Sequence, residues 1–276
     1  MAKGISIHIG INTVDSSHYA DENGQPWDGA LMACEFDAKD MQKLAKAKKF
    51  EAQMLLTQQA TAANVIAAIT AAASKLQSGD MLLLTYSGHG SQVDDKTNEE
   101  NDGKDETWVL YDRELLDDEL YVLWSKFKKG VRILVLSDSC HSGTVAKAIQ
   151  MNTVARATSQ TFRFRGMPPE AAKATYQKNK KLYDGLQTAN PKGDKVKVNA
   201  RVLLFSGCQD QQFSQDGDRN GLFTENLKKA LKKGAAKNYK ALHKQIATAM
   251  PPWQVPNYFA TGAANPTFEA QKPFVI

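Results

Sequence analysis

The strongest constraint on the fold comes from two short apolar runs that each end in a turn of small and polar residues. Residues 131–136 lead into Ser-Asp-Ser-Cys-His-Ser-Gly, and residues 81–86 lead into Ser-Gly-His-Gly. Apolar runs of this length are typical of strands that are buried on both faces of a parallel sheet. The sequence therefore predicts two buried strands that present Cys140 and His89 just beyond their ends.

Helical patterns alternate with strand patterns over most of the chain. Residues 4–11 and 53–56 predict two further strands, residues 201–206 predict a fifth, and the tail 251–276 could add an edge strand. Apolar residues at helical spacing occur in residues 31–44, 61–76, 116–127, 222–232 and 238–249. Such alternation predicts an α/β fold with a mostly parallel central sheet of about six strands, flanked by helices on both faces.

Two polar stretches interrupt this alternation. Residues 94–107 are acidic, lack apolar periodicity and predict an exposed loop. Residues 147–200 are rich in Lys and Arg, and their only helical pattern covers about 169–187. We predict a single domain in which 147–200 is an exposed connector between a first part, 1–146, and a last part, 201–276.

The composition, with 42% hydrophobic and 24% charged residues, is that of an ordinary globular protein. No apolar run is long enough for a membrane span or for a signal peptide. No basic stripe interleaved with aromatic residues favours nucleic-acid binding. Three widely spaced cysteines fit neither a disulfide framework nor a Cys-rich zinc site. We expect a cytoplasmic monomer with reduced thiols, in which Cys34 and Cys208 are core residues.

The thiol of Cys140 and the imidazole of His89 suggest a nucleophile and its base. Ligands of open α/β sheets collect beyond the carboxyl ends of the strands. Because consecutive parallel strands are usually neighbours, the two side chains could come within hydrogen-bond distance, as such a pair requires. The backbone N–H groups of Gly90 and Cys140 are candidates for an oxyanion hole.

Three other interpretations of the motifs fit less well. A zinc site that adds His141 to the two motif side chains lacks a fourth ligand. A tyrosine-phosphatase loop requires an arginine where Ala146 stands. The stretch that begins at Asp216 resembles the start of a calcium-binding EF-hand loop, but its twelfth position is Leu227 and not glutamate, so we predict a turn.

Several stretches together resemble the caspase-like cysteine peptidases, and specifically the bacterial metacaspases (orthocaspases). The separation of 51 residues between His89 and Cys140 is also similar to the spacing of about 50 in caspases. The matching stretches are residues 86–90, 138–143, 29–38, 102–106 with 116–120, and 206–211 with 223–224.

The resemblance implies a cysteine endopeptidase that cleaves protein or peptide substrates after Arg or Lys through an acyl-enzyme. Cys140 would be the nucleophile and His89 the base. Asp37, Asp138 and Ser87 would form the pocket for the P1 side chain, which belongs to the residue whose carbonyl is attacked. The chemistry agrees, because a carboxylate pair binds a guanidinium through charge-assisted hydrogen bonds.

The resemblance also implies calcium in many members, held here by Asp105, Asp117 and Asp118. A fourth ligand position, seven residues after the cysteine, holds Lys147, whose cationic side chain could neutralise the same acids without a metal. The peptidase chemistry itself requires no cofactor, and calcium dependence stays open.

The connector is often cut by the enzyme itself in this family. It offers four basic residues as candidate self-cleavage sites, Lys147, Arg156, Arg163 and Arg165. A merely basic, solvated loop is the alternative.

Two other functions could use the same residues. One is a proteolytically silent, caspase-like interaction or switch module. The other is a peptide ligase with the same Cys/His pair. The presence of both Cys140 and His89 speaks against the silent module, whereas a ligase would use the same pair and stays an alternative.

Overall fold

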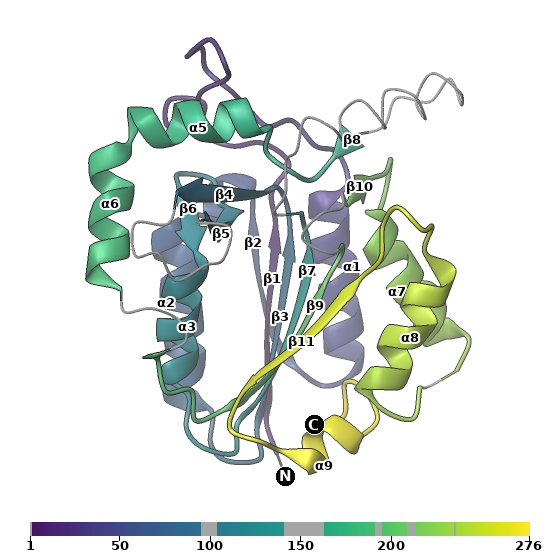
Figure 1. Cartoon of the computed structure of the whole chain (residues 1–276). Coiled ribbons are helices and arrows are strands. Elements are labelled where there is room, and N and C mark those ends of the chain that lie inside the picture. Colours follow the sequence, from purple (N-terminus) through teal and green to yellow (C-terminus); the bar gives the residue numbers. More distant parts are fainter. Residues whose placement is uncertain (1, 95–103, 141–162, 191–194, 209–213, 235) are drawn as a thin grey trace.

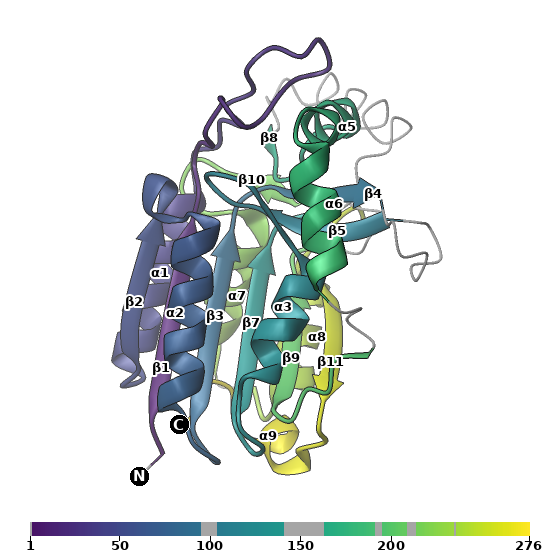
Figure 2. The same cartoon turned by 90° about the vertical axis from the view of Figure 1, so that its left-hand side faces the viewer.

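A six-stranded central sheet organises the computed structural model (Figures 1 and 2). The predicted α/β class, with a mostly parallel sheet of six strands and helices on both faces, is confirmed. None of the described helices is long and apolar enough to cross a membrane. The structure describes residues 2–94, 104–140, 163–190, 195–208, 214–234 and 236–276.

The strands follow the order β11-β9-β7-β3-β1-β2 across the sheet. All neighbours pair in parallel except β11, which is antiparallel to β9 and forms the edge strand predicted in the tail. The strands are β1 (Gly4–Gly10), β2 (Glu51–Leu56), β3 (Met81–Ser87), β7 (Arg132–Asp138), β9 (Arg201–Ser206) and β11 (Asn257–Gly262).

Two layers of helices cover the sheet. On one face lie α2 (Ala62–Lys75) and α3 (Asp117–Ser125), and on the other lie α1 (Cys34–Ala47), α7 (Leu222–Lys232) and α8 (Tyr239–Ala249) (Figure 1). Side chains alternate across a strand, so the apolar run of β3 fills both cores. Its Leu82 and Leu84 join the cluster around α2, whereas Met81 and Leu83 join the cluster around α8. A short helix, α9 (Pro266–Ala270), lies near the C-terminus.

Smaller elements gather beyond the carboxyl ends of the parallel strands (Figure 2). A three-stranded antiparallel sheet and a two-stranded antiparallel pair lie there, together with two helices. They are β4 (Gly90–Asp94), β5 (Lys104–Val109), β6 (Glu114–Leu116), β8 (Arg163–Phe164), β10 (Gln215–Asp216), α5 (Pro169–Lys178) and α6 (Lys180–Ala189).

The prediction of an exposed acidic loop over 94–107 is wrong at its end. Residues from Lys104 onward form β5, and the side chains of Asp105 and Thr107 are buried. This strand pairs with β4 on one side and β6 on the other and is the middle strand of its sheet.

The prediction of an exposed connector over 147–200 is also wrong for part of the residues that the structure describes there. Arg165, Tyr176 and Tyr183 are buried, and the single predicted helix is two consecutive helices, α5 and α6. The apolar side chains of these helices pack on the elements around β4 while their lysines stay in solvent. Of the candidate self-cleavage residues, Lys147 and Arg156 lie outside the described residues.

Candidate active site

The two motifs meet because their strands are neighbours. Strand β3 pairs with β7 in parallel, and the pairing register sets Ser87 opposite Asp138. The next neighbour, β9, ends at the same edge, with Ser206 opposite Ser137. The parallel sheet thus brings the turns after β3, β7 and β9 to one edge, where ligands of such sheets are expected.

The three predicted pocket residues surround the side chain of Arg165, which is fully buried. Arg165 Nη2 lies 2.7 Å from Asp37 Oδ2, and Nη1 lies 2.9 Å from Asp138 Oδ2. Ser87 Oγ accepts a hydrogen bond of 2.8 Å from Arg165 Nη1 and donates one of 2.8 Å to Asp37. The pocket therefore holds a guanidinium that the chain itself supplies from the connector.

The start of α7 fixes the two predicted carboxylates. Asp138 accepts hydrogen bonds from the backbone N–H and the hydroxyl of Thr224, at 3.1 and 2.8 Å. Asp37 accepts from the side-chain amide of Asn220 at 2.8 Å and from the backbone N–H of Gly221 at 3.2 Å. Burial raises the pKa of Asp37 to about 6, although the charge of Arg165 acts to lower it.

Sequence reasoning missed a third carboxylate of the pocket, Asp216. Its Oδ1 accepts hydrogen bonds from Arg165 Nε at 3.2 Å and from Nη2 at 2.9 Å. The sequence marks Asp216 only as part of a turn, and no spacing rule connects it with the two motifs. Its place depends on the pairing of β10 with β8, in which Asp216 stands opposite Arg163.

The backbone of Arg165 is held as tightly as its side chain. Its carbonyl oxygen accepts hydrogen bonds of 3.0 Å from the N–H groups of Gly90 and Cys140, the two groups predicted to form an oxyanion hole. Its own N–H donates to the carbonyl of Ser214 at 2.9 Å, and Met167 N–H donates to the carbonyl of Gly90 at 2.8 Å. The segment around Arg165 thus lies across the site with one peptide carbonyl between two N–H donors.

The imidazole of His89 is buried beside this segment. Its Nε2 lies 3.0 Å from the carbonyl oxygen of Gly29, so Nε2 carries the proton and donates it. Burial lowers the pKa of His89 to about 4, and the Gly29 carbonyl only partly offsets this effect. The other nitrogen, Nδ1, is buried without a hydrogen-bond partner in the described part of the chain. A buried lone pair of this kind costs about 1–3 kcal/mol and calls for an explanation.

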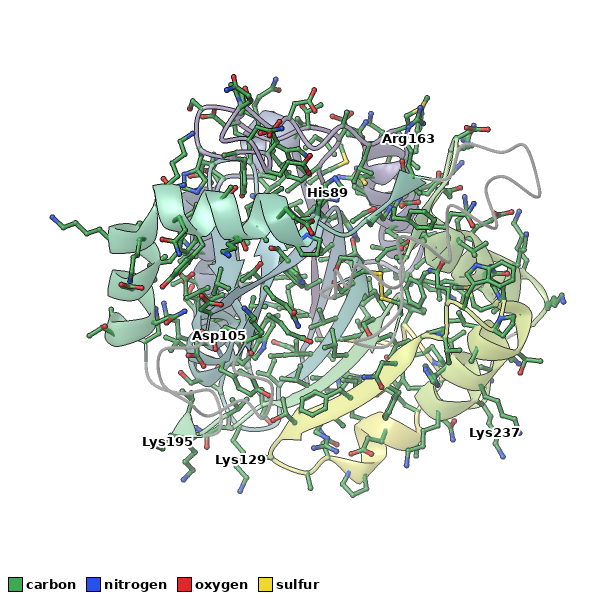
Figure 3. The ribbon with its side chains drawn as sticks, turned by 45° about the horizontal axis from the view of Figure 1, so that its top comes forward. His89, Asp105, Lys129, Arg163, Lys195 and Lys237 are labelled. Carbon is green, nitrogen blue, oxygen red and sulfur yellow. A yellow bond between two sulfur atoms is a disulfide. The ribbon has the colours of Figure 1, made fainter. Side chains whose placement is uncertain are left out.

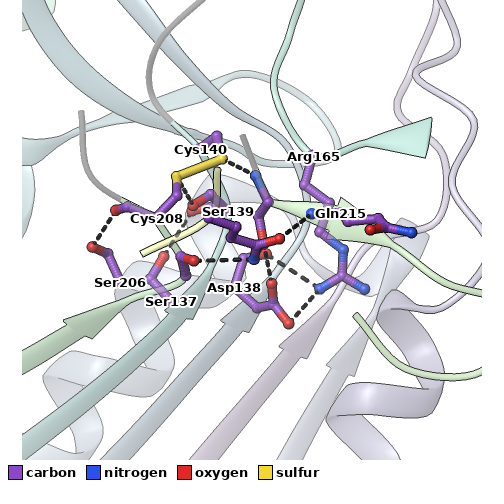
Figure 4. The surroundings of a disulfide bond; sticks show 11 residues. Ser137, Asp138, Ser139, Cys140, Arg165, Ser206, Cys208 and Gln215 are labelled. Carbon is purple, nitrogen blue, oxygen red and sulfur yellow. Dashed lines mark hydrogen bonds and ion pairs between the residues drawn. A yellow bond between two sulfur atoms is a disulfide. The ribbon is translucent and has the colours of Figure 1, made fainter. Parts of the chain in front are cut away.

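The sulfur of Cys140 forms a disulfide bond with Cys208 (Figure 4). This contradicts the expectation that the cysteines stay unpaired; Cys208 is buried as predicted, but as a disulfide partner, and only Cys34 is free. The separation of 68 residues conceals the contact, which arises because both cysteines follow the ends of the adjacent strands β7 and β9. A sulfur in this bond is not a free thiol, and reduction would restore it.

The three predicted calcium ligands lie apart from this site, and Figure 3 shows Asp105 well separated from His89. Asp105 lies on β5, while Asp117 and Asp118 begin α3. Burial and the charges of Asp118 and Asp105 raise the pKa of Asp117 well above its ordinary value. Within the described residues, no three His, Cys, Asp or Glu side chains are arranged to hold a metal ion. Lys147 lies outside the described residues.

Comparisons with known proteins agree with this geometry. The crystal structure of protein GSU0716 from Geobacter sulfurreducens is 48% identical, has a TM-score of 0.88, and the match covers 99% of this chain and 98% of that one. Metacaspase-1 of Eremothecium gossypii is 30% identical over 190 residues, which are 59% of this chain and 42% of that protein. Metacaspase-1 of Cryptococcus neoformans var. neoformans serotype D is 29% identical over 249 residues, which are 78% of this chain and 52% of that protein.

The chain spans about half the length of the curated relatives it matches. A family profile described as the caspase domain matches residues 14–273, which is nearly the whole chain. The central sheet and its two helical layers are those of the caspase-like fold. The chain belongs to the caspase-domain family of peptidases and is of the metacaspase type.

Proposed function

We propose that this protein is a cysteine endopeptidase that cleaves protein substrates after basic residues, with Cys140 as nucleophile and His89 as base. The single observation that carries the proposal is the docking of Arg165. Its guanidinium lies among buried carboxylates while its carbonyl oxygen accepts hydrogen bonds from Gly90 and Cys140 N–H. A substrate arginine would occupy the same place, with its carbonyl carbon next to the nucleophile.

The proton path follows from the tautomer of His89. After reduction of the disulfide, the Cys140 thiol passes its proton to the unpartnered Nδ1, and the thiolate forms a C–S bond with the P1 carbonyl carbon. The resulting oxyanion is stabilised by the two N–H donors. His89 then gives the proton to the leaving amine as the C–N bond breaks, and later deprotonates the water that hydrolyses the thioester. The bond from Nε2 to Gly29 keeps the ring oriented throughout.

We further propose that the chain cleaves itself at the bond between Arg165 and Gly166. Of the two candidates that the structure describes, Arg163 is exposed at the rim on β8, whereas Arg165 fills the pocket. The carbonyl of Arg165 is the one that accepts hydrogen bonds from Gly90 and Cys140 N–H. An uncleaved chain would keep the pocket filled and exclude other substrates.

In this proposal calcium would have a structural role and no catalytic one. The described positions of Asp105, Asp117 and Asp118 do not form a metal site, so these acids would have to move closer together to hold the ion. Its charge would then relieve the repulsion that raises the pKa of Asp117. The cysteine chemistry does not use it. Self-cleavage measured with calcium and with a chelator tests this part, and a chelator that abolishes cleavage would make calcium a requirement.

Cleavage of a fluorogenic peptide that ends in Phe-Arg tests the function, with the full chain assayed under a reducing agent. We expect cleavage by wild type and a loss of about 10⁴-fold or more in Cys140→Ala, because removal of a nucleophile abolishes the covalent route. Circular dichroism would verify that the variant folds. Equal cleavage by the two proteins would refute the proposal, and mass spectrometry of the products separates hydrolysis from peptide ligation.

A further inference from the structure

The third carboxylate of the pocket, Asp216, has no counterpart among the residues predicted to bind P1. We propose that Asp216 makes the site selective for arginine over lysine at P1. This inference rests on the proposed peptidase function and adds a specificity-determining residue to it. Its basis is the contact of Asp216 with Nε of Arg165, an atom that lysine lacks.

The three carboxylates meet different parts of one guanidinium. Asp138 faces Nη1, Asp37 faces Nη2, and Asp216 Oδ1 accepts from both Nε and Nη2. The side chains of Arg165 and Asp216 are both 0% exposed, so these bonds form without competition from water. Together they follow the planar fork of donors that distinguishes a guanidinium from an ammonium group.

Asp216 is also held by donors outside the segment that carries Arg165. Its Oδ2 accepts a hydrogen bond of 2.8 Å from the backbone N–H of Met32, and its Oδ1 lies 3.3 Å from the N–H of Ala33. These donors directly precede α1, which begins at Cys34. The carboxylate is therefore oriented toward the position of Nε before a substrate arrives, which favours selectivity.

A lysine would leave part of this arrangement unsatisfied. The guanidinium of arginine presents three nitrogens to the carboxylates. The side chain of lysine carries a single nitrogen, which cannot lie near all three carboxylates at once. The wall of the pocket lies close to the guanidinium at Gly221, because a Cβ added to this residue would lie 2.4 Å from Arg165 Nη1. Buried carboxylates that lose their donors are costly, and sites built to hydrogen-bond a substrate discriminate strongly against an analogue that lacks the donor.

The test compares two reporter peptides that differ only in Arg or Lys at P1, with the reduced full chain. We expect kcat/KM to favour Arg by about 100-fold or more in wild type, and Asp216→Asn to lower this ratio at least about tenfold. Asp218→Asn is the matched control, because it removes the same charge from an exposed position in the same loop and should keep the wild-type ratio. A ratio is insensitive to the fraction of protein that is active.

The outcomes separate the two proposals. If wild type cleaves neither peptide, the peptidase function itself fails. If wild type cleaves both equally, or if Asp216→Asn keeps the wild-type ratio, the peptidase stands and the role of Asp216 is overturned. If Asp216→Asn is inactive or unfolded, a second variant, Arg165→Lys, supplies the test. The inference expects its self-cleavage, followed by intact mass, to be at least about tenfold slower than that of wild type.

Discussion

Two buried titrating side chains determine the pH range in which this site can work. Burial lowers the pKa of His89 to about 4, so the imidazole stays neutral at ordinary pH, as the proposed role of proton acceptor requires. Burial raises the pKa of Asp37 to about 6, even with the cationic Arg165 beside it. In a pocket without Arg165 this lowering effect is lost, and the Asp37 carboxyl would titrate at a higher pH still.

This difference predicts which group controls the acid side of the pH profile. Below about pH 6 Asp37 becomes protonated and loses its charge, so kcat/KM for an Arg peptide should fall with an apparent pKa of 6 or above. Asp37→Asn should abolish this fall of kcat/KM at acid pH and should also lower activity at neutral pH. A wild-type profile that stays flat down to about pH 4, where His89 titrates, would contradict the assignment to Asp37.

The bond between Cys140 and Cys208 predicts a specific response to oxidation. Reaction of wild type with oxidised glutathione should form the internal disulfide, with the loss of two hydrogens and release of both glutathione molecules. Cys208→Ser cannot form it and should keep one glutathione on Cys140. Intact mass distinguishes the two products, and the same glutathione adduct on both proteins would contradict the pairing.

At the scale of elements, the start of α7 forms a wall around the docked side chain of Arg165. The backbone N–H of Gly221 donates to Asp37, and a Cβ at this position would lie 2.4 Å from Arg165 Nη1 and 2.5 Å from Asp138 Oδ2. Only a residue without a side chain leaves room for the guanidinium here. Under the proposed function, the turn before α7 takes part in the recognition of P1.

Gly221→Ala should lower kcat/KM for Arg peptides by at least about tenfold, because the added methyl group occupies the place of the guanidinium. Gly185→Ala in α6 is the control: its Cβ would meet open space, so activity should stay and the free energy of unfolding should rise by about 1 kcal/mol. Parallel kinetics and thermal unfolding check both variants. Full activity of Gly221→Ala would place the substrate arginine elsewhere.

The sequence predicts the elements best where apolar periodicity is strong. The apolar runs of β3 and β7 and the helical spacing of α1 and α2 give the parallel sheet and its layers. Strand β5 escapes prediction because its residues lack apolar alternation, and its pairing with β4 and β6 is a contact that no local pattern reveals. The connector is misjudged for a similar reason, since its many lysines conceal the apolar side of α5 and α6.

At the scale of the whole molecule, the contacts that assemble the site join residues far apart in the chain. Cys140, His89, Asp37 and Asp138 are predictable because short motifs carry them. Arg165 and Asp216 are not, since which basic residue docks, and which acid meets it, depends on the path of the chain after β7 and on the pairing of β8 with β10. A sequence shows four candidate basic residues with no means to rank them.

The two fragments that self-cleavage after Arg165 produces should stay associated as one folded particle. Strand β9 pairs with β7, and Leu203 and Phe205 share a hydrophobic core with Leu134 and Leu136. The two fragments should therefore elute together in size-exclusion chromatography under a reducing agent, which opens the bond between Cys140 and Cys208, and separate only when denaturant is added. Separate elution of the fragments without denaturant would mean that the chain beyond residue 165 is not needed to complete the sheet.

The most direct test of the account is the intact mass of the reduced full chain after incubation, compared for wild type, Cys140→Ala and Arg165→Gln. We predict that wild type yields two fragments, one ending at Arg165 and one beginning at Gly166, and that both variants leave this bond intact. Arg165→Gln should still cleave an added Arg peptide, because its pocket is then open. Initial cleavage of wild type at another basic residue, or cleavage at Arg165 in Cys140→Ala, would contradict the account.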